Sequence, residues 1–159
     1  MDYRIVLADL THTGSGISAL TFPLGTAFVA SYAQQELGSS FDFKLYKFPE
    51  ALATSVFKNP PLVLAFANYS WNLELSYKLA ACAKKQFPNL IVVAGGPNFP
   101  VSDSEKSLFL SQRSAIDFYV EYEGEIGFVD LLRRLREFDF DASGLKNHGE
   151  RITNCSYPA

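Results

Sequence analysis

A polar stretch near the N-terminus contains the first side chains in this sequence that could do chemistry. Residues 11–16 read Thr-His-Thr-Gly-Ser-Gly and closely follow the apolar run 5–8. Hydroxyl groups and glycines in such a loop can wrap a phosphate where the loop leads into a helix. A histidine can instead coordinate a metal ion. The stretch therefore has three interpretations: a phosphate loop, a metal-ligand loop around His12, or an ordinary polar loop.

A second candidate segment follows an apolar run in the middle of the chain. Ser70, Trp71 and Asn72 offer a hydroxyl, an aromatic face and an amide in three consecutive residues. Ser70 or Asn72 could equally cap the next helix, with the tryptophan packed at the edge of the domain. These residues are therefore candidate ligand contacts, and each has a structural alternative.

Two further segments contain glycines and acidic residues. Residues 95–97 read Gly-Gly-Pro after an apolar run, where bare backbone can approach a flat ligand or form a tight turn. Residues 123–125 read Glu-Gly-Glu near the start of a helix, where negative charge is favourable even without a ligand. The candidate contacts in these two segments are Gly95, Gly96, Pro97, Glu123, Gly124 and Glu125.

These residues do not form a catalytic constellation. The sequence has two histidines, His12 and His148, and no Ser-His-acid arrangement can be argued from it. It has no Gly-Lys-Ser/Thr phosphate loop. A response regulator would need an aspartate where the third strand ends, but Asn68 stands there. Two cysteines, Cys82 and Cys155, are too few for a disulfide framework and too far apart for a zinc clip.

Short apolar runs alternate with helical patterns, and these elements must position the candidate residues. Runs rich in β-branched and aromatic residues predict five strands: Arg4–Ala8, Phe41–Tyr46, Leu62–Ala67, Leu90–Ala94 and Ala115–Val120. A helix or crossover is expected between the second and third strands. Apolar spacing and start signals predict four further helices: one that begins at Pro23, and others over Leu75–Phe87, Ser102–Ser111 and Phe128–Leu135.

This alternation predicts an α/β fold. The expected architecture is a three-layer sandwich, with a five-stranded parallel sheet of order 2-1-3-4-5 and helices on both faces, as in flavodoxin-like and Rossmann-like proteins. Ligands of such sheets bind beyond the carboxyl ends of the strands, near the switch point between the first and third strands. All four candidate segments follow strands, so we expect them to crowd one rim of the sheet.

The bulk properties indicate one globular domain. The chain has 159 residues, of which 48% are hydrophobic and 19% charged, with a net charge of −3. This balance does not predict a nucleic-acid partner, and the apolar runs are too short for a membrane span. We expect a reduced, cytoplasmic protein. Residues 1–138 are expected to form the domain, and residues 139–159, which lack a periodic pattern, to form a tail or linker.

Four segments, read in order, carry a resemblance to a known family. They are Phe22–Gly25, Ser70–Asn72, Pro88–Pro97, and Tyr122–Glu125 with Phe128 and Leu131–Leu132 behind it. Together they resemble the N-terminal cobalamin (vitamin B12)-binding domain of radical S-adenosylmethionine (SAM) enzymes. The resemblance covers most of the chain, from Arg4 to about Leu135. It implies a parallel sheet sandwiched by helices, whose carboxyl-end rim holds the corrin ring.

The resemblance also implies roles for the candidate residues. The Ser70–Asn72 segment would border the corrin ring, and Leu24 and Gly25 would lie beside it. The glycine pair would let the backbone approach the nucleotide tail of the cofactor, and residues 123–125 would close the rim. The full set of expected cofactor contacts is Thr11, His12, Leu24, Gly25, Ser70, Trp71, Asn72, Gly95, Gly96, Pro97, Glu123, Gly124 and Glu125.

The first two interpretations of the polar stretch now look unfavourable. A flavodoxin phosphate loop leads directly into a helix, but Ile17–Thr21 intervene here before Pro23, which has no N–H. The cobalt-ligand pattern Asp-x-His-x-x-Gly fails because His12 comes three residues after Asp9 and Ser15 stands where the glycine is needed. Members of the radical family commonly lack this histidine ligand. We therefore interpret the stretch as a loop at the rim of the site, with no metal ligand.

The catalytic half of the family is not represented in this sequence. It carries a Cys-x-x-x-Cys-x-x-Cys motif for a [4Fe-4S] cluster that works with SAM, whereas Cys82, expected in the core, and Cys155 stand far apart. We therefore expect the cobalamin-binding part of a larger enzyme for methyl transfer or related radical chemistry. Residues 144–152 would lead toward the catalytic domain, its partner. Alone, the chain would bind cobalamin without catalysis. The alternatives are a flavodoxin-like carrier of flavin mononucleotide (FMN) and a cofactor-free interaction domain.

Overall fold

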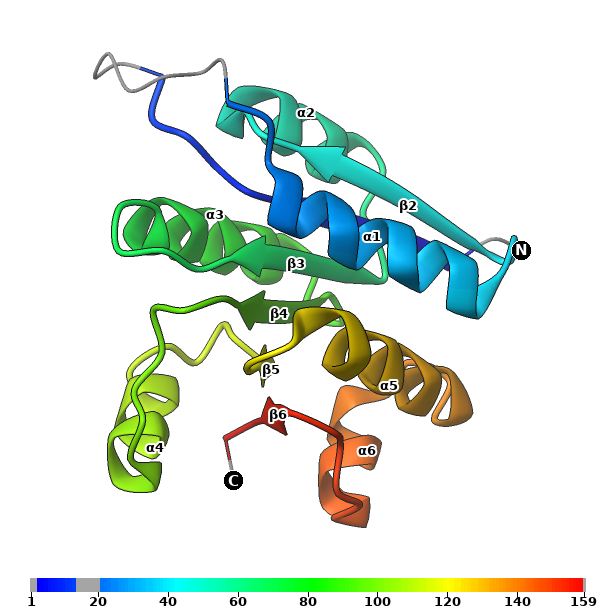
Figure 1. Ribbon diagram of the computed structural model, residues 1–159. Coiled ribbons are helices and arrows are strands. Elements are labelled where there is room, and N and C mark those ends of the chain that lie inside the picture. Colours follow the sequence, from blue (N-terminus) through cyan, green and yellow to red (C-terminus); the bar gives the residue numbers. More distant parts are fainter. Residues whose placement is uncertain (1–2, 14–20, 159) are drawn as a thin grey trace.

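The computed structural model describes residues 3–13 and 21–158, and their strands form one six-stranded sheet (Figure 1). The strand order is β2-β1-β3-β4-β5-β6. The first five strands pair in parallel, which confirms the expected α/β class and the 2-1-3-4-5 order. These strands are β1 (Tyr3–Ala8), β2 (Phe41–Tyr46), β3 (Val63–Ala67), β4 (Ile91–Gly95) and β5 (Phe118–Val120).

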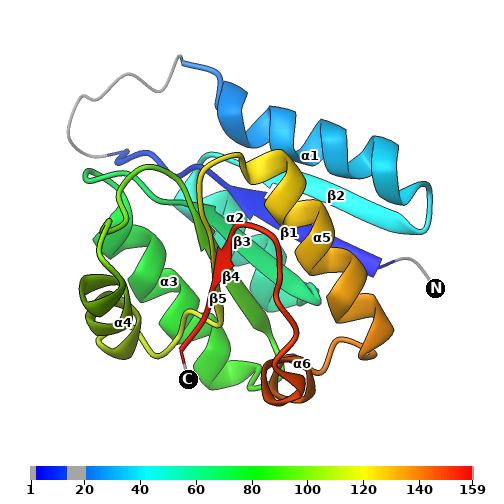
Figure 2. The same cartoon turned by 60° about the horizontal axis from the view of Figure 1, so that its bottom comes forward.

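Helices cover both faces of the sheet, as the second view shows (Figure 2). One face carries α1 (Leu24–Leu37), α5 (Gly124–Glu137) and α6 (Ala142–His148). The other carries α2 (Pro49–Lys58), α3 (Leu73–Gln86) and α4 (Asp103–Ser111). Alternate residues of each strand point to opposite faces, so the sheet separates two hydrophobic cores. Ile5 and Leu7 belong to the first core, and Val6 and Ala8 to the second.

The sixth strand corrects the expectation of a five-stranded sheet with no core element after Phe138. Residues beyond that point form α6 and β6 (Cys155–Ser156), which pairs antiparallel with β5. Leu145 and Ile152 from this segment are buried in the first core. Leu145 lies in a seven-residue helix and Ile152 in the loop before β6, and two apolar side chains this far apart are too sparse to produce a recognisable period.

The orientation of α3 also differs from the expectation. The helical spacing of Leu75, Leu79, Cys82, Ala83 and Phe87 predicts that this stripe faces the core. Ala83 is buried as expected, but the other buried positions are Ser76 and Ala80, and Cys82 is exposed. Small side chains let this helix lie close to the sheet, while Leu75 and Leu79 pack only at its flanks. Hydrophobicity alone therefore misplaced the buried face by about one position.

None of the helices in the described ranges is long and apolar enough to cross a membrane. The longest helices, α1, α3 and α5, each have 14 residues. Within the sandwich, α1 and α5 lie side by side over the same face of the sheet (Figures 1 and 2). Their N-terminal ends lie above the carboxyl ends of the strands, which is where the candidate site begins.

Candidate functional site

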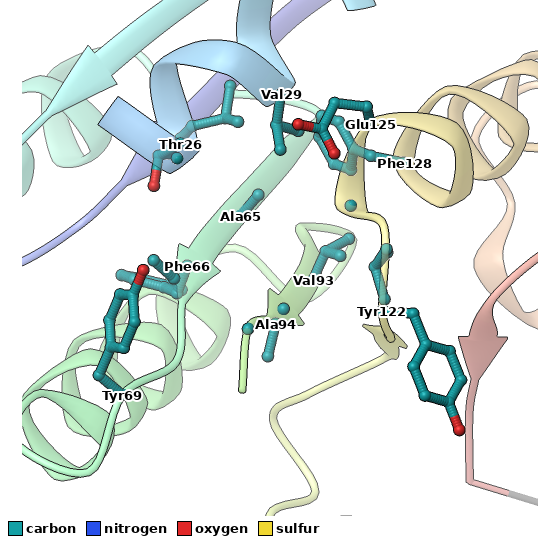
Figure 3. Close-up of a pocket in the computed structure, with 17 residues that line it drawn as sticks. Thr26, Val29, Ala65, Phe66, Tyr69, Val93, Ala94, Tyr122, Glu125 and Phe128 are labelled. Carbon is teal, nitrogen blue, oxygen red and sulfur yellow. The ribbon is translucent and has the colours of Figure 1, made fainter. Parts of the chain in front are cut away.

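A pocket of about 220 Å³ opens at the carboxyl ends of the strands, between α1 and α5 (Figure 3). Residues from β1, β3, β4 and β5 form its floor, and the first turns of the two helices form its walls. It lies where the sheet order reverses direction, between β1 and β3. This is the position at which open parallel sheets bind ligands.

The floor of the pocket is apolar. Alternate residues on adjacent parallel strands point to the same face, so strands that lie side by side contribute one layer of side chains. Phe128 on α5 adds one more side chain to this apolar layer. The side chains that form the floor are Leu7, Ala65, Val93, Val120 and Phe128, all of them buried in the first core.

Polar side chains stand at the mouth of the pocket. Thr26 on α1, Tyr69 after β3 and Glu125 on α5 bring two hydroxyl groups and one carboxylate to it. In Figure 3, Tyr69 extends from the segment after β3 toward Thr26, while Glu125 lies near Val29 and Phe128. A ligand in this pocket would therefore meet apolar surface at depth and hydrogen-bonding groups near solvent.

Glycines shape two sides of the pocket. Gly96 has φ +124°, and a Cβ there would lie 2.8 Å from the Asn68 carbonyl oxygen, so the turn after β4 requires glycine. A Cβ on Gly25 of α1 would make ordinary van der Waals contact with Tyr69 Oη at 3.9 Å, so only a larger side chain would extend over the mouth. A Cβ on Gly124 would lie 3.2 Å from Val29, so glycine permits the close approach of α5 to α1.

A buried hydrogen-bond network holds the glycine turn in place from behind. Tyr119 Oη donates to the Gly96 carbonyl oxygen at 2.9 Å and accepts from Asn68 Nδ2 at 2.9 Å. Asn68 Nδ2 also donates to the Asn98 carbonyl oxygen at 2.7 Å. Burial raises the pKa of Tyr119 well above its usual range, so its hydroxyl stays protonated and can donate. The network therefore fixes the shape of this turn from the core side.

The structure brings five of the thirteen sequence-predicted residues to the pocket and places the other eight around it. The five lining residues are Gly25, Gly95, Gly96, Gly124 and Glu125. The residues that do not line it are Thr11, His12, Leu24, Ser70, Trp71, Asn72, Pro97 and Glu123. Both groups belong to the segments that follow strands or open helices, and those segments do meet at one rim.

Several of the eight outer residues have definite structural contacts. Asn72 is fully buried, and its Oδ1 accepts from the Tyr69 N–H at 2.9 Å. Its Nδ2 donates to Asp9 Oδ1 and to the Leu10 carbonyl oxygen, both at 3.3 Å. Burial raises the pKa of Asp9, and Lys47 partly opposes that shift. Asn72 therefore joins the loops after β1 and β3 through its own hydrogen bonds.

The exposed outer residues form an aromatic edge beside the mouth. Trp71 is 55% exposed and stacks on Tyr69, with ring centroids 4.5 Å apart. His12 Nε2 lies 2.8 Å from the Trp71 carbonyl oxygen, which can only accept, so this nitrogen carries the proton. Among the residues that the structure describes, no group of three or more His, Cys, Asp or Glu side chains could hold a metal ion.

Sequence reasoning missed the residues that project into the pocket from within the elements. Thr26 and Val29 lie one and four positions after Gly25 in α1, and Ala65 and Val93 lie inside strands. Tyr69 directly precedes the candidate segment Ser70–Asn72, and it lines the pocket whereas those three residues do not. Strand alternation could have indicated Ala65 and Val93 once the facing helices were known.

The polar stretch 11–16 lies only partly within the described residues. Positions 14–16 lie outside them. Helix α1 begins at Leu24 after Pro23, with no side-chain cap. This geometry gives no support to a flavodoxin phosphate loop.

Comparisons with known proteins show what this chain is similar to. No family model matches the chain. The chain is 32% identical over 116 residues to the cobalamin-dependent radical SAM methyltransferase TokK of Streptomyces tokunonensis, covering 69% of this chain and 16% of that protein. It is 32% identical over 124 residues to the 2-(S-pantetheinyl)-carbapenam-3-carboxylate methyltransferase of Streptantibioticus cattleyicolor, covering 74% of this chain and 18% of that protein.

A solved structure shares the fold of the whole chain. It is the cobalamin-dependent SAM radical enzyme OxsB with aqua-cobalamin and SAM bound. The TM-score is 0.68 at 14% identity, over 98% of this chain and 21% of OxsB. The chain therefore spans less than a quarter of the length of each of these proteins.

Proposed function

Because this chain belongs to the family of cobalamin-binding domains of radical SAM enzymes, we propose that it binds cobalamin at the carboxyl-end rim of its sheet. The corrin ring would lie over the mouth of the pocket, and the nucleotide tail would enter it. The observation that carries this proposal is the pocket itself, which opens at the switch point of the sheet with glycine on two sides.

The residues around the pocket fit such a ligand. Gly25 leaves space beside the mouth that a larger side chain would fill, and the turn at Gly96 brings bare backbone to the opposite side. Thr26, Tyr69 and Glu125 can exchange hydrogen bonds with the ribose and amide groups of the cofactor. Trp71 offers an exposed aromatic face next to them. When bound, cobalamin supplies the ability to carry a methyl group or an electron, and the chain's own residues bind and orient it.

The complete enzyme would contain a separate catalytic domain. The chain spans only 16% and 18% of the two curated relatives, and its sequence has two cysteines, too few for the three-cysteine motif that would ligate a [4Fe-4S] cluster. We infer that a catalytic domain with SAM and the cluster acts together with this domain. On its own, the chain would bind cobalamin and would not catalyse methyl transfer.

A visible-absorbance titration with hydroxocobalamin tests the proposal, with FMN as the comparison ligand. The wild-type chain should bind hydroxocobalamin saturably and should not bind FMN. The Gly25→Leu variant should weaken binding by at least tenfold, which corresponds to about 1.4 kcal/mol, because the new side chain would cover the mouth beside Tyr69. Leucine is a better helix former than glycine, so the fold should not suffer.

The matched control is Ser31→Leu, which adds the same side chain to an exposed position of the same helix. It should leave hydroxocobalamin binding unchanged. Absence of hydroxocobalamin binding by the wild-type chain would contradict the proposal. Equal binding by the Gly25→Leu variant and the wild type would place the cofactor elsewhere.

A further inference from the structure

We propose that the floor of the pocket selects the base at the end of the nucleotide tail. It should accept an apolar benzimidazole base and disfavour a purine base that carries an exocyclic amine. This inference rests on the proposed function, because it concerns the same pocket and the same class of ligand. It goes further because it assigns a preference for one tail base to the floor residues, which were not among the expected cofactor contacts.

The side chains of the floor have no hydrogen-bonding groups. Leu7, Ala65, Val93, Val120 and Phe128 present only carbon atoms to the pocket. All five are buried, so they do not offer a route for water to reach a bound base from below. A base in contact with this surface gains apolar contact, and any polar atom pressed against it loses its hydration.

The backbone N–H and C=O groups beneath the floor already form hydrogen bonds within the sheet. β3 pairs with β1 on one side and β4 on the other, and β4 pairs with β5. The ladder hydrogen bonds of these parallel strands use the N–H and C=O groups between the floor residues. At the end of β4, the Gly95 carbonyl oxygen accepts from the Asn68 N–H at 2.6 Å. Neither the side chains nor these backbone groups are therefore placed to partner a purine amine.

The polar groups of the pocket stand at the wrong depth for the base. Thr26, Tyr69 and Glu125 are at the mouth, and the ring of Tyr122, which also lines the pocket, points away from it (Figure 3). The corrin ring carries many amide groups and suits the polar mouth, whereas the narrower tail would enter with its base end first. The ribose and phosphate that tether the base then lie at the mouth beside these polar groups. The base reaches the floor, where only apolar contacts are available.

The expected discrimination is moderate. An apolar pocket rejects a ligand of similar size with added polar groups by about 10- to 100-fold, because the polar atoms remain without partners. A purine base also lacks the two methyl groups of dimethylbenzimidazole and so gains less apolar contact with the floor. Both effects have the same sign for a base that has already left cobalt, so the titrations use the dicyano forms, in which the tail base of each cobamide is free.

Three corrinoids that share one corrin ring test the inference in absorbance titrations of the same chain. They are cobalamin, the cobamide with adenine as its tail base, and cobinamide, which has no nucleotide tail. Cobalamin should bind about 10- to 100-fold more tightly than the adenine cobamide, and cobinamide should bind more weakly than cobalamin. Equal affinity for the two cobamides would overturn the inference while leaving the proposed function intact. Absence of cobalamin binding would overturn both.

A floor variant gives a second readout that does not depend on stability. Ala65→Ser places a hydroxyl in the floor with little added volume. It should bring the affinities for cobalamin and the adenine cobamide closer together, because the serine hydroxyl can form a hydrogen bond with the purine. Ala80→Ser makes the same change at a buried position of α3, on the other side of the sheet, and should leave the ratio unchanged. The inference would be contradicted if Ala65→Ser left the affinity ratio of the two cobamides unchanged, or if Ala80→Ser changed that ratio equally. Either result would show that the floor does not discriminate between the two bases.

Discussion

At the scale of single residues, the glycine turn after β4 depends on a tyrosine from the neighbouring strand. Gly96 adopts a conformation that side chains rarely allow, and its carbonyl oxygen accepts from the buried Tyr119 hydroxyl. Phe99 stacks on the Tyr119 ring with centroids 3.7 Å apart, which fixes the position of the hydroxyl. The shape of one pocket wall is thus set by side chains that do not line the pocket.

Tyr119→Phe should therefore destabilise the domain by about 1–2 kcal/mol. The change leaves the Gly96 carbonyl oxygen without its donor and removes an acceptor from Asn68, while the ring packing is retained. The measurement is equilibrium unfolding in urea. Tyr32→Phe, at a half-exposed position of α1, is the control and should change stability by less than about 0.5 kcal/mol. Equal effects of the two substitutions would mean that the network does not support the turn.

At the scale of elements, the C-terminal segment completes the first core and extends the sheet. The Thr153 N–H donates to Asp130 on α5 at 2.8 Å, and the Glu121 N–H donates to the Asn154 carbonyl oxygen at 2.7 Å. Leu145 of α6, only 1% exposed, packs in the same core as Leu135 of α5. These contacts join the segment to α5, which forms one wall of the pocket.

Leu145→Ala should accordingly cost about 2–5 kcal/mol of stability, the usual range for a fully buried leucine. Leu108→Ala, at a position of α4 that is 56% exposed, should cost far less. Thermal and urea unfolding of the two variants would measure the difference. If Leu145→Ala were as mild as Leu108→Ala, residues beyond 138 would act as the separate tail that the sequence pattern had indicated.

At the scale of the whole molecule, the sheet could be predicted from the sequence more completely than the site. Runs such as Leu62–Ala67 predict strands because a parallel strand buried on both faces needs a continuous apolar run. The segments after the strands then had to meet at one rim, and Gly95, Gly96 and Glu125 from those segments do line the pocket. Which side chains of α1 enter the pocket depends on the rotation of this helix about its own axis. Knowing only that ligands bind beyond the ends of the strands does not determine that rotation.

The pocket glycines offer the most direct test of the central claim, that cobalamin binds at this pocket. Two-dimensional ¹H–¹⁵N spectra of the labelled chain would be recorded with and without one equivalent of hydroxocobalamin. The amide signals of Gly25, Gly95, Gly96 and Gly124, which line the pocket, should shift or broaden. Those of Gly38 and Gly149, which do not line it, should stay in place. Unchanged pocket glycines, or shifts confined to Gly38 and Gly149, would contradict the account.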